Sequence, residues 1–511
     1  MNYLVTQEEM RAYDIYTIEQ IGIPALVLME RAALAVAERV KSVLQDRKGK
    51  VLCVCGSGNN GGDGLALARL LLDEGIEVQA VFLGEEGRAG REVQTQLSIL
   101  SHYEVKPLKE VQREEYAVVV DAIFGTGLSR EVTGIYRLAI EMINGLGAYT
   151  ISIDIPSGLN GDTGKVLGAA VEADETVTLA FAKRGLYLYP GPLYAGKVTI
   201  ADIGITERSF DGRRPGMYTR EDAPATLWPK RRPDGNKGTF GKLLLTAGSE
   251  GMAGAALLAG ESAYRAGAGM VKLVIPEAVR TIVQEKLPEA LLLSYGKSTA
   301  LTDEEENAFL ESLRWAGTLA IGPGLSVCES GRRFLELALK TTKPLLIDAD
   351  GLNILAEDDN LRQLLKNRRK TGGRTVLTPH MGELARLLRR PLKEVTEAEA
   401  ESTYLAAAEF DCIVVGKSAR SYVYEPGGEM FLNTVGNDKM ATAGSGDTLF
   451  GIIAALTAQG MDMRDAAETG VYLHARAGDA AAEDAKGAGI TASDIIRGLS
   501  ALNRKTDCEE T

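Results

Sequence analysis

Histidine and cysteine are scarce in this chain, and neither is clustered. The 511 residues include three histidines, at 102, 380 and 474, and five cysteines, at 53, 55, 328, 412 and 508, without a C-x-x-C pair. A zinc site needs several such ligands close together, so the sequence predicts none. We expect reduced, structural thiols, since Cys53 and Cys55 alternate along a predicted strand as small core residues do.

Long apolar runs and an excess of positive charge are lacking as well. No apolar stretch approaches the roughly 18 residues of a membrane span, and the N-terminus has neither a basic region nor an apolar leader. The net charge of -13 repels nucleic acid and anionic membranes. We therefore expect a cytoplasmic protein with no nucleic-acid or membrane partner, in which local backbone donors capture any phosphate-bearing ligand.

Glycine and chain length are what the sequence has in abundance. With 57 glycines in 511 residues, the chain is too long for one core and carries many tight turns. Short β-rich runs alternate with helical ones, which indicates parallel sheets covered on both faces. The expected strands lie at 51–55, 78–83, 117–121, 151–155, 242–247, 270–275, 318–321, 344–348, 374–377 and 412–415. We predict an α/β protein with two doubly wound domains, residues 1–212 and 236–505, joined by a Pro- and Gly-rich linker at 213–235.

A helix-rich segment precedes the first predicted strand. Leu26, Met29, Ala32, Ala33 and Val36 recur in it at helical spacing. We expect this apolar face either to pack on the sheet or to form a subunit contact, and we predict a homo-oligomer.

The first glycine-rich loop, residues 56–63, precedes a helix expected to begin near Leu65. Backbone N–H groups in such a loop, together with the following helix N-terminus, favour an anion. Residues 56–61 match G-x-G-x-x-G, which alone would indicate a dehydrogenase. A lone match is weak, and the Asn-Asn-Gly-Gly-Asp tail is more polar than a pyrophosphate loop requires.

Two further strand ends carry polar side chains. Asp121 ends one predicted strand, and Asp154 and Ser157 follow another. The carboxyl ends of parallel strands converge on one crevice, so we expect these side chains to meet Asn60 there. Oxygen ligands of low total charge suit K⁺ better than a divalent ion. The alternative for each aspartate is a cap of a helix or turn.

At these motifs, over roughly residues 1–210, the chain resembles the NAD(P)H-hydrate epimerase domain, which also forms the N-terminal half of bifunctional NAD(P)H-hydrate repair enzymes. The resemblance extends to Leu28-Met29-Glu30-Arg31-Ala32 and to Lys183. It implies a Rossmann-like domain with K⁺ held by Asn60, Asp121 and Ser157. The hydrated dinucleotide would be bound by Asn59, Asn60, Gly61, Gly62, Asp63, Gly125, Thr126, Gly127, Leu128, Ser129, Arg130, Glu131 and Asp154. Asp154 is our candidate acid/base for epimerisation.

The second glycine-rich loop, Ala443-Gly444-Ser445-Gly446-Asp447, opens an apolar helix expected at 449–456. Its N–H groups can stabilise a transferring phosphoryl group, while Asp447 can take a proton from the attacking hydroxyl. This combination is typical of ribokinase-like phosphoryl transfer. The alternative is that Asp447 is only a helix N-cap. Further motifs lie at other strand ends, at 322–325, 348–353, 378–383 and 415–418.

Together these motifs resemble the ADP- or ATP-dependent NAD(P)H-hydrate dehydratase domain, a ribokinase-like fold, over roughly residues 225–505. The resemblance implies a hydrate pocket lined by Ala253, Gly324, His380 and Asp447. It implies an adenine-nucleotide site formed by Lys417, Ser418, Ala419, Arg420, Ser421 and Gly446. The chain departs from the family at Asn236, Met381 and Ser418, where His, Pro and often Gly are usual.

The resemblance implies a bifunctional repair enzyme. The first domain would interconvert the R and S epimers of NADHX and NADPHX, and the second would use ADP, or ATP, with Mg²⁺ to dehydrate the S epimer. One alternative is a small-molecule kinase of the hydroxymethylpyrimidine or hydroxyethylthiazole type, fused to a dinucleotide-binding domain, which predicts a stable phosphorylated product. A nucleotide-sensing scaffold, the second alternative, predicts binding without turnover.

Overall fold

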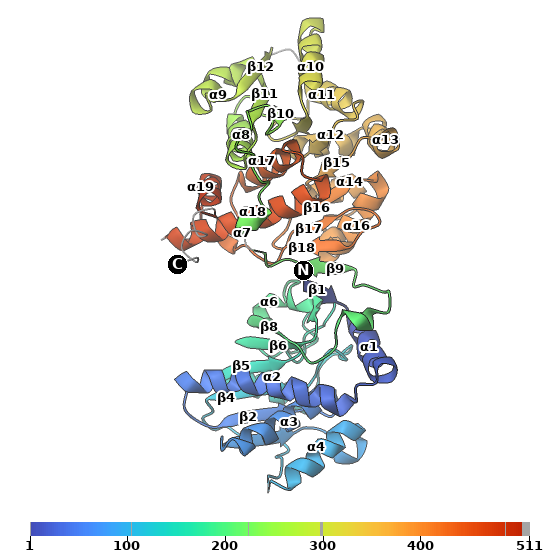
Figure 1. Ribbon diagram of the computed structural model, residues 1–511, viewed down its shortest axis with the longest axis vertical. Coiled ribbons are helices and arrows are strands. Elements are labelled where there is room, and N and C mark those ends of the chain that lie inside the picture. The colour runs from blue at the N-terminus through green and yellow to red at the C-terminus, as the bar shows by residue number, and fades with distance from the viewer. Residues whose placement is uncertain (1, 104, 223, 297–299, 486, 503–511) are drawn as a thin grey trace. The chain divides into compact units, whose positions relative to one another are not determined.

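Strands alternate with helices along most of the chain in the computed structural model, as Figure 1 shows. The structure describes residues 2–103, 105–222, 224–296, 300–485 and 487–502. It divides into two units, Met1–Tyr218 and Thr219–Thr511. Cys508 and the expected end of the second domain, residues 503–505, lie outside the described residues. No helix in the described ranges is long and apolar enough to cross a membrane.

The first unit is built on a six-stranded parallel sheet in the order β3-β2-β4-β5-β6-β8. The strands are β2 (Val51–Cys55), β3 (Val78–Phe82), β4 (Val118–Ala122), β5 (Tyr149–Ile153), β6 (Glu175–Leu179) and β8 (Lys197–Ala201). The α-helices that follow the N-terminal segment are α2 (Ala25–Asp46), α3 (Asn59–Asp73), α4 (Arg91–Ser101), α5 (Gly134–Gly145) and α6 (Pro192–Ala195). Every residue of β2 and β4 is buried, as their continuous apolar sequences require of central parallel strands.

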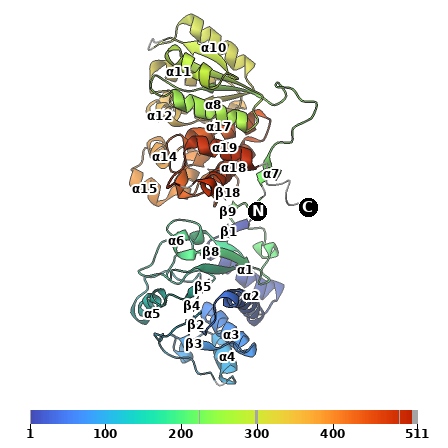
Figure 2. The same cartoon turned by 90° about the vertical axis from the view of Figure 1, so that its left-hand side faces the viewer.

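Helices cover both faces of this sheet. Ile140 and Ile143 of α5 pack in one cluster with Leu52 and Val54 of β2. The alternate strand residue Cys55 faces α3 instead, where a Cβ at Gly64 would lie 2.8 Å from its Sγ. Figure 2 shows α5 on one side of the sheet and α2 with α3 on the other. The apolar face of α2 contacts β4 and β6, so of the two expectations for this segment the structure shows sheet packing.

The N-terminal segment adds a short strand and a helix to this unit. β1 (Asn2–Val5) pairs in parallel with β7 (Ala182–Lys183). α1 (Gln7–Tyr16) begins after Thr6, whose hydroxyl accepts from the Glu9 N–H while the Glu9 carboxylate accepts from the Thr6 N–H. α1 continues into a π-helical turn, η1 (Thr17–Ile21). β9 (Met217–Thr219) spans the boundary between the units.

The second unit has a larger sheet in the order β12-β11-β10-β13-β14-β15-β16-β17-β18, parallel as far as β16 and antiparallel beyond it. Its strands are β10 (Lys242–Thr246), β11 (Met270–Pro276), β12 (Leu291–Tyr295), β13 (Thr318–Ile321), β14 (Leu345–Ile347), β15 (Thr375–Leu377), β16 (Ile413–Gly416), β17 (Tyr422–Tyr424) and β18 (Met430–Leu432). Its helices are α7 (Pro224–Leu227), α8 (Ala253–Arg265), α9 (Arg280–Lys286), α10 (Asp303–Trp315), α11 (Glu329–Leu339), α12 (Ala349–Glu357), α13 (Asp359–Arg368), α14 (Met381–Leu388), α15 (Leu392–Glu397), α16 (Glu399–Phe410), α17 (Ser445–Ala458), α18 (Met463–Asp484) and α19 (Ala492–Leu502).

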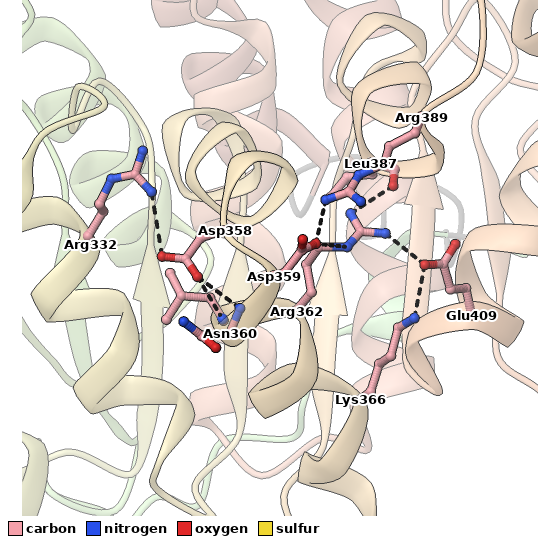
Figure 3. A network of polar contacts seen from close by, with 10 residues as sticks. Arg332, Asp358, Asp359, Asn360, Arg362, Lys366, Leu387, Arg389 and Glu409 are labelled. Carbon is pink, nitrogen blue, oxygen red and sulfur yellow. Dashed lines mark hydrogen bonds and ion pairs between the residues drawn. The ribbon is translucent and has the colours of Figure 1, made fainter.

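A buried arginine ties three helices of this unit together. Figure 3 shows Arg362 of α13, which donates to the Leu387 carbonyl of α14 at 2.9 Å and to Glu409 of α16 at 2.7 Å. Lys366 donates to the same carboxylate at 3.0 Å. Because Arg362 is 6% exposed, both bonds form away from bulk water, where unpaired charge is costly. The network anchors the end of α14, whose beginning lies at the candidate site.

Candidate active sites

The first glycine-rich segment forms a tight turn between β2 and α3. A Cβ at Gly56 would lie 2.0 Å from the Ile123 carbonyl oxygen, and one at Gly61 would lie 1.8 Å from the Gly56 carbonyl oxygen. These approaches allow no side chain. α3 begins at Asn59 rather than near Leu65, so the expected helix start was wrong. Residues 60–63 are therefore buried in the first turns of the helix, and Asn59 is exposed.

The ends of β4 and β5 meet as expected. The Asp121 carboxylate accepts from the Ser157 N–H at 2.8 Å, the Ser157 hydroxyl at 2.5 Å and the Ser152 hydroxyl at 2.9 Å. Burial raises the pKa of Asp121, although these hydrogen bonds lower it. Asn60 is 7% exposed, and neither of its amide atoms has a hydrogen-bond partner in the described part of the chain. Such an orphaned buried amide calls for a ligand.

Asp154 follows β5 with a left-handed backbone, φ +69°. Lys183 of β7, 1% exposed, donates from Nζ to Asp154 Oδ1 and to the Leu179 carbonyl at 2.8 Å. The Leu179 N–H also donates to Oδ1, at 3.2 Å. Lys183 lies within the segment of family resemblance but had no predicted role, because only the pairing of β5 with β6 brings it to Asp154. The carboxylate is thus held by a buried cation.

Gly125 lies between the orphaned amide and the held carboxylate. A Cβ at Gly125 would lie 3.4 Å from both Asn60 Cβ and Asp154 Oδ2, so the missing side chain leaves these groups close together. Of the other segment residues expected to bind substrate, Thr126 is half-buried and Leu128 is buried. The exposed ones are Gly127, Ser129, Arg130 and Glu131.

The second glycine-rich loop ends at the N-terminus of α17. Gly444 is the N-cap with φ +87°, and Asp447 lies in the first turn of the helix, so Asp447 is not the N-cap. Burial raises the pKa of Asp447 to about 7, with a further contribution from Asp348, while Lys417 lowers it. A carboxyl with this pKa can act as a proton acceptor near neutral pH.

Lys417 and Asp348 form the charged centre of this site. Lys417 Nζ donates to Asp348 Oδ1 at 2.8 Å and Oδ2 at 3.1 Å, and a Cβ at Gly446 would lie 3.3 Å from the same nitrogen. Burial opposes the lysine charge, but Asp348 and Glu383 raise the pKa of Lys417. The ammonium therefore lies at the glycine-rich loop. Of the other expected nucleotide residues, Ser418, Arg420 and Ser421 are half-buried and Ala419 is exposed.

His380 caps α14 at the end of β15. Its Nδ1 accepts from the Gly382 N–H at 3.0 Å, and the Glu383 carboxylate accepts from the His380 N–H at 2.9 Å. Burial and Lys417 lower the pKa of His380, whereas burial raises that of Glu383 to about 7. Glu383 had no predicted role. A local signal for Glu383 was present in the sequence, because an acid three residues after a helix N-cap is the pattern of a capping box.

The remaining expected residues lie at neighbouring loops. Gly324, with φ +60°, packs where a Cβ would be 2.9 Å from Ala255 Cβ, next to Ala253 at the start of α8. The departures from the family pattern have local partners. The Ser418 hydroxyl donates to Glu399 at 2.7 Å, Asn236 Oδ1 accepts from the Gly238 N–H at 2.9 Å, and Met381 is buried.

Helix α18 holds the segment that leads into the second loop. Asp479 accepts from the Asn437 side-chain amide at 2.8 Å and from the Gly436 N–H at 3.2 Å. His474 lies with Nε2 3.3 Å from the Ser445 hydroxyl, and burial lowers its pKa to about 4, so the ring is neutral. Neither contact was predicted, because nothing local in the sequence relates α18 to this loop.

Comparisons with known proteins find a matching family for each half of the chain. The family described as YjeF-related protein N-terminus matches residues 25–185, and the family described as NAD(P)H-hydrate dehydratase matches residues 243–500. The bifunctional NAD(P)H-hydrate repair enzyme Nnr of Moorella thermoacetica is 38% identical, over 97% of this chain and 95% of that protein. The enzyme of the same name from Thermofilum pendens is 36% identical, over 96% and 94%, and that from Escherichia coli is 32% identical, over 96% and 92%.

Among solved structures, a ribokinase-like protein of Enterococcus faecalis is 25% identical over 57% of this chain and 96% of its own, with a TM-score of 0.48. The ADP/ATP-dependent NAD(P)H-hydrate dehydratase of Bacillus subtilis, co-crystallised with ATP and Mg²⁺, is 28% identical over 55% of this chain and 95% of its own, with a TM-score of 0.47.

Proposed function

The chain belongs to the family of bifunctional NAD(P)H-hydrate repair enzymes, and on this premise we propose how its residues divide the two reactions. It is an enzyme that epimerises R- and S-NAD(P)HX and dehydrates S-NAD(P)HX to NAD(P)H at the expense of a nucleotide. The relatives do not support the small-molecule kinase alternative. One observation carries the assignment of residues: each unit places an aspartate beside a lysine at the carboxyl end of its sheet, Asp154 with Lys183 and Asp447 near Lys417.

Asp154 acts as the acid/base of epimerisation. The substrate hydroxyl lies on a carbon next to the ring nitrogen, so the nitrogen electron pair assists its loss and only protons need to be moved. Lys183 and the Leu179 N–H hold Oδ1, which leaves Oδ2, next to Gly125, for the substrate. Residues 59–63 and 125–131 bind the hydrated dinucleotide.

Asn60, Asp121 and Ser157 hold K⁺. The support is the Asn60 amide oxygen, buried without a partner in the described chain, and the Asp121 and Ser157 oxygens gathered at the neighbouring strand ends. A bound K⁺ would supply a fixed positive charge at this end of the sheet.

Asp447 takes the proton from the substrate hydroxyl as that oxygen attacks the terminal phosphorus of the nucleotide. The loop N–H groups around Gly446 and the Lys417 ammonium stabilise the transferring phosphoryl group. The bond between that phosphorus and the bridging oxygen of the nucleotide breaks, and the shortened nucleotide leaves (AMP, where ADP is the donor). The ring nitrogen electron pair then expels phosphate, the adjacent ring carbon loses a proton, and the double bond of NAD(P)H is restored. Lys417, residues 418–421 and Gly446 bind the nucleotide, for which we propose ADP with Mg²⁺. Ala253, Gly324 and His380 line the hydrate pocket.

The domain limits follow from the same assignment: residues 1–212 for the epimerase, 213–235 for the linker and 236–505 for the dehydratase. The division of the structure after Tyr218 falls within this linker. We further propose a cytoplasmic homo-oligomer that acts on NADHX and NADPHX.

Recovery of reduced nicotinamide absorbance tests the assignment. An equimolar mixture of the two NADHX epimers is given to the full chain with Mg²⁺ and K⁺, and with ADP, ATP or no nucleotide. Complete recovery that depends on nucleotide is expected. Recovery of half the absorbance would show that the epimerase is inactive, and a stable phosphorylated product without recovery would contradict the dehydratase assignment.

A further inference from the structure

Helix α1 precedes the segment matched by the first family, residues 25–185, yet one side of it borders the epimerase site. Gln7, Met10 and Asp14 are three and four residues apart and therefore share this side. Gln7 Nε2 donates to the Leu128 carbonyl at 3.4 Å, within the segment assigned to substrate binding, and Met10 is buried. α1 thus contacts the segment assigned to substrate binding, residues 125–131, at its first turn.

Asp14 lies two turns further along the same side and is half-buried. Its carboxyl has no hydrogen bond or ion pair within the described residues, whereas Lys183 is already engaged by Asp154. Burial raises the pKa of Asp14, and so does the negative charge of Asp154, while Lys183 lowers it. Burial also raises the pKa of Asp63 on α3, and the negative charges of Asp154 and Asp14 raise it further. Asp63, Asp154 and Lys183 are therefore the charged groups near enough to Asp14 to influence its ionisation or to be influenced by it.

The stereochemistry of epimerisation calls for a proton carrier on each face of the ring. One carboxyl gives a proton to the hydroxyl, the C–O bond breaks, and water leaves as the ring nitrogen supplies an electron pair. The ring carbon is then planar. Water attacks the opposite face, a new C–O bond forms, the electron pair returns to nitrogen, and a second carboxylate takes the released proton. One proton is given and one is taken, so nothing is oxidised or reduced.

We propose that Asp14 is the second acid/base of the epimerase site, serving the face of the nicotinamide ring opposite to Asp154. This inference rests on the function proposed for Asp154. A pair of carboxyls with one proton between them serves both directions, because each turnover leaves the two groups in the protonation states that the reverse reaction requires. Asp63 is the less suitable partner, since it is 6% exposed and lies within the first turns of α3.

The test uses the full chain and the purified R epimer with nucleotide, so that absorbance recovers only after epimerisation. The S epimer reports the dehydratase alone, as an internal control in the same protein. The variants are Asp14→Asn, Asp14→Glu, Asp63→Asn and Asp154→Asn, with Glu19→Gln as a matched control on the adjoining exposed turn of η1.

We expect Asp14→Asn to lower kcat from the R epimer by about a hundredfold or more with little change in KM, and to remove one ionisation from its pH profile. Asp14→Glu should restore part of the rate, and Glu19→Gln should behave as wild type. The inference is overturned if Asp14→Asn keeps its rate while Asp154→Asn loses it, if only KM changes, or if Asp63→Asn alone removes the ionisation. Normal epimerisation by Asp154→Asn would instead overturn the proposed function.

Discussion

Lys417 and Asp348 form a partly buried ion pair with Nζ–Oδ distances of 2.8 and 3.1 Å, although they are 69 residues apart in the chain. The pair joins the ends of β14 and β16 and places the ammonium beside Gly446 at the glycine-rich loop. Asp348 in turn contributes to the raised pKa of Asp447. The contact therefore fixes the ammonium at the glycine-rich loop, and its carboxylate adds to the effect of burial on the pKa of Asp447.

The rate of dehydration should follow the ionisation of Asp447. Because the pKa of this carboxyl is raised to about 7 and a base must be ionised, kcat/KM should rise roughly tenfold per pH unit below about pH 7 and level off above it. Initial rates with the S epimer, measured across about pH 5 to 9, check this. Asp484→Asn, at an exposed position of α18, is the control. A profile that is flat across this range would contradict the role.

Replacing the same carboxyl should stabilise the second unit at high pH. The pKa of Asp447 is higher in the folded state, at about 7, than its ordinary value of 3.8, so the folded state binds more protons between these values. The free energy of unfolding therefore falls as pH rises from about 4 to about 7, by on the order of 4 kcal/mol. Asp447→Asn should remove this loss. We expect the thermal midpoint of Asp447→Asn to exceed that of wild type at pH 8, and this difference to shrink toward pH 4. An equal increase in the thermal midpoint at both pH values would show that the ionisation of Asp447 is not its cause.

Two glycines of the first loop should respond differently to alanine. A Cβ at Gly61 would lie 1.8 Å from the Gly56 carbonyl oxygen, whereas nothing lies within 4 Å of one at Gly58. Gly61→Ala should destabilise the first unit by about 3 kcal/mol or more, and Gly58→Ala should be tolerated. Denaturant unfolding of the two variants measures the difference. Equal free energies of unfolding for Gly61→Ala and Gly58→Ala would contradict the prediction, because they would show that the turn accommodates a side chain at Gly61.

Releasing the second loop from α18 should slow dehydration without unfolding the unit. Asp479→Ala removes the acceptor of the Gly436 and Asn437 hydrogen bonds. The loop N–H groups would then be less precisely placed, and we expect kcat to fall about tenfold or more while the thermal midpoint changes little. Asp484→Ala, on the same helix, is the matched control. A loss confined to the thermal midpoint would mean that the contact is only structural.

Local signals in the sequence were sufficient for the ten predicted strands and for the family, but not for β6, β8, β12, β17 and β18. β2 (Val51–Cys55) and β13 (Thr318–Ile321) have the predicted bounds, because runs of β-branched and apolar residues mark a buried parallel strand without reference to the rest of the chain. The two glycine-rich motifs with their aspartates likewise indicated two sites, since the chemistry of a glycine turn before a helix is local.

Only the tertiary structure decided where α3 begins and which charges meet. The Asn-Asn-Gly-Gly-Asp segment has little helix propensity, yet it is helical because Gly61 packs on the Gly56 backbone and Gly64 packs on Cys55. The order β14-β15-β16 brings Lys417 to Asp348. The pairing of β5 with β6 brings Lys183, which follows β6, to Asp154. Sequence motifs state which groups can do chemistry, but ion pairing depends on distances between strands that are remote in the chain, and these distances are set by packing.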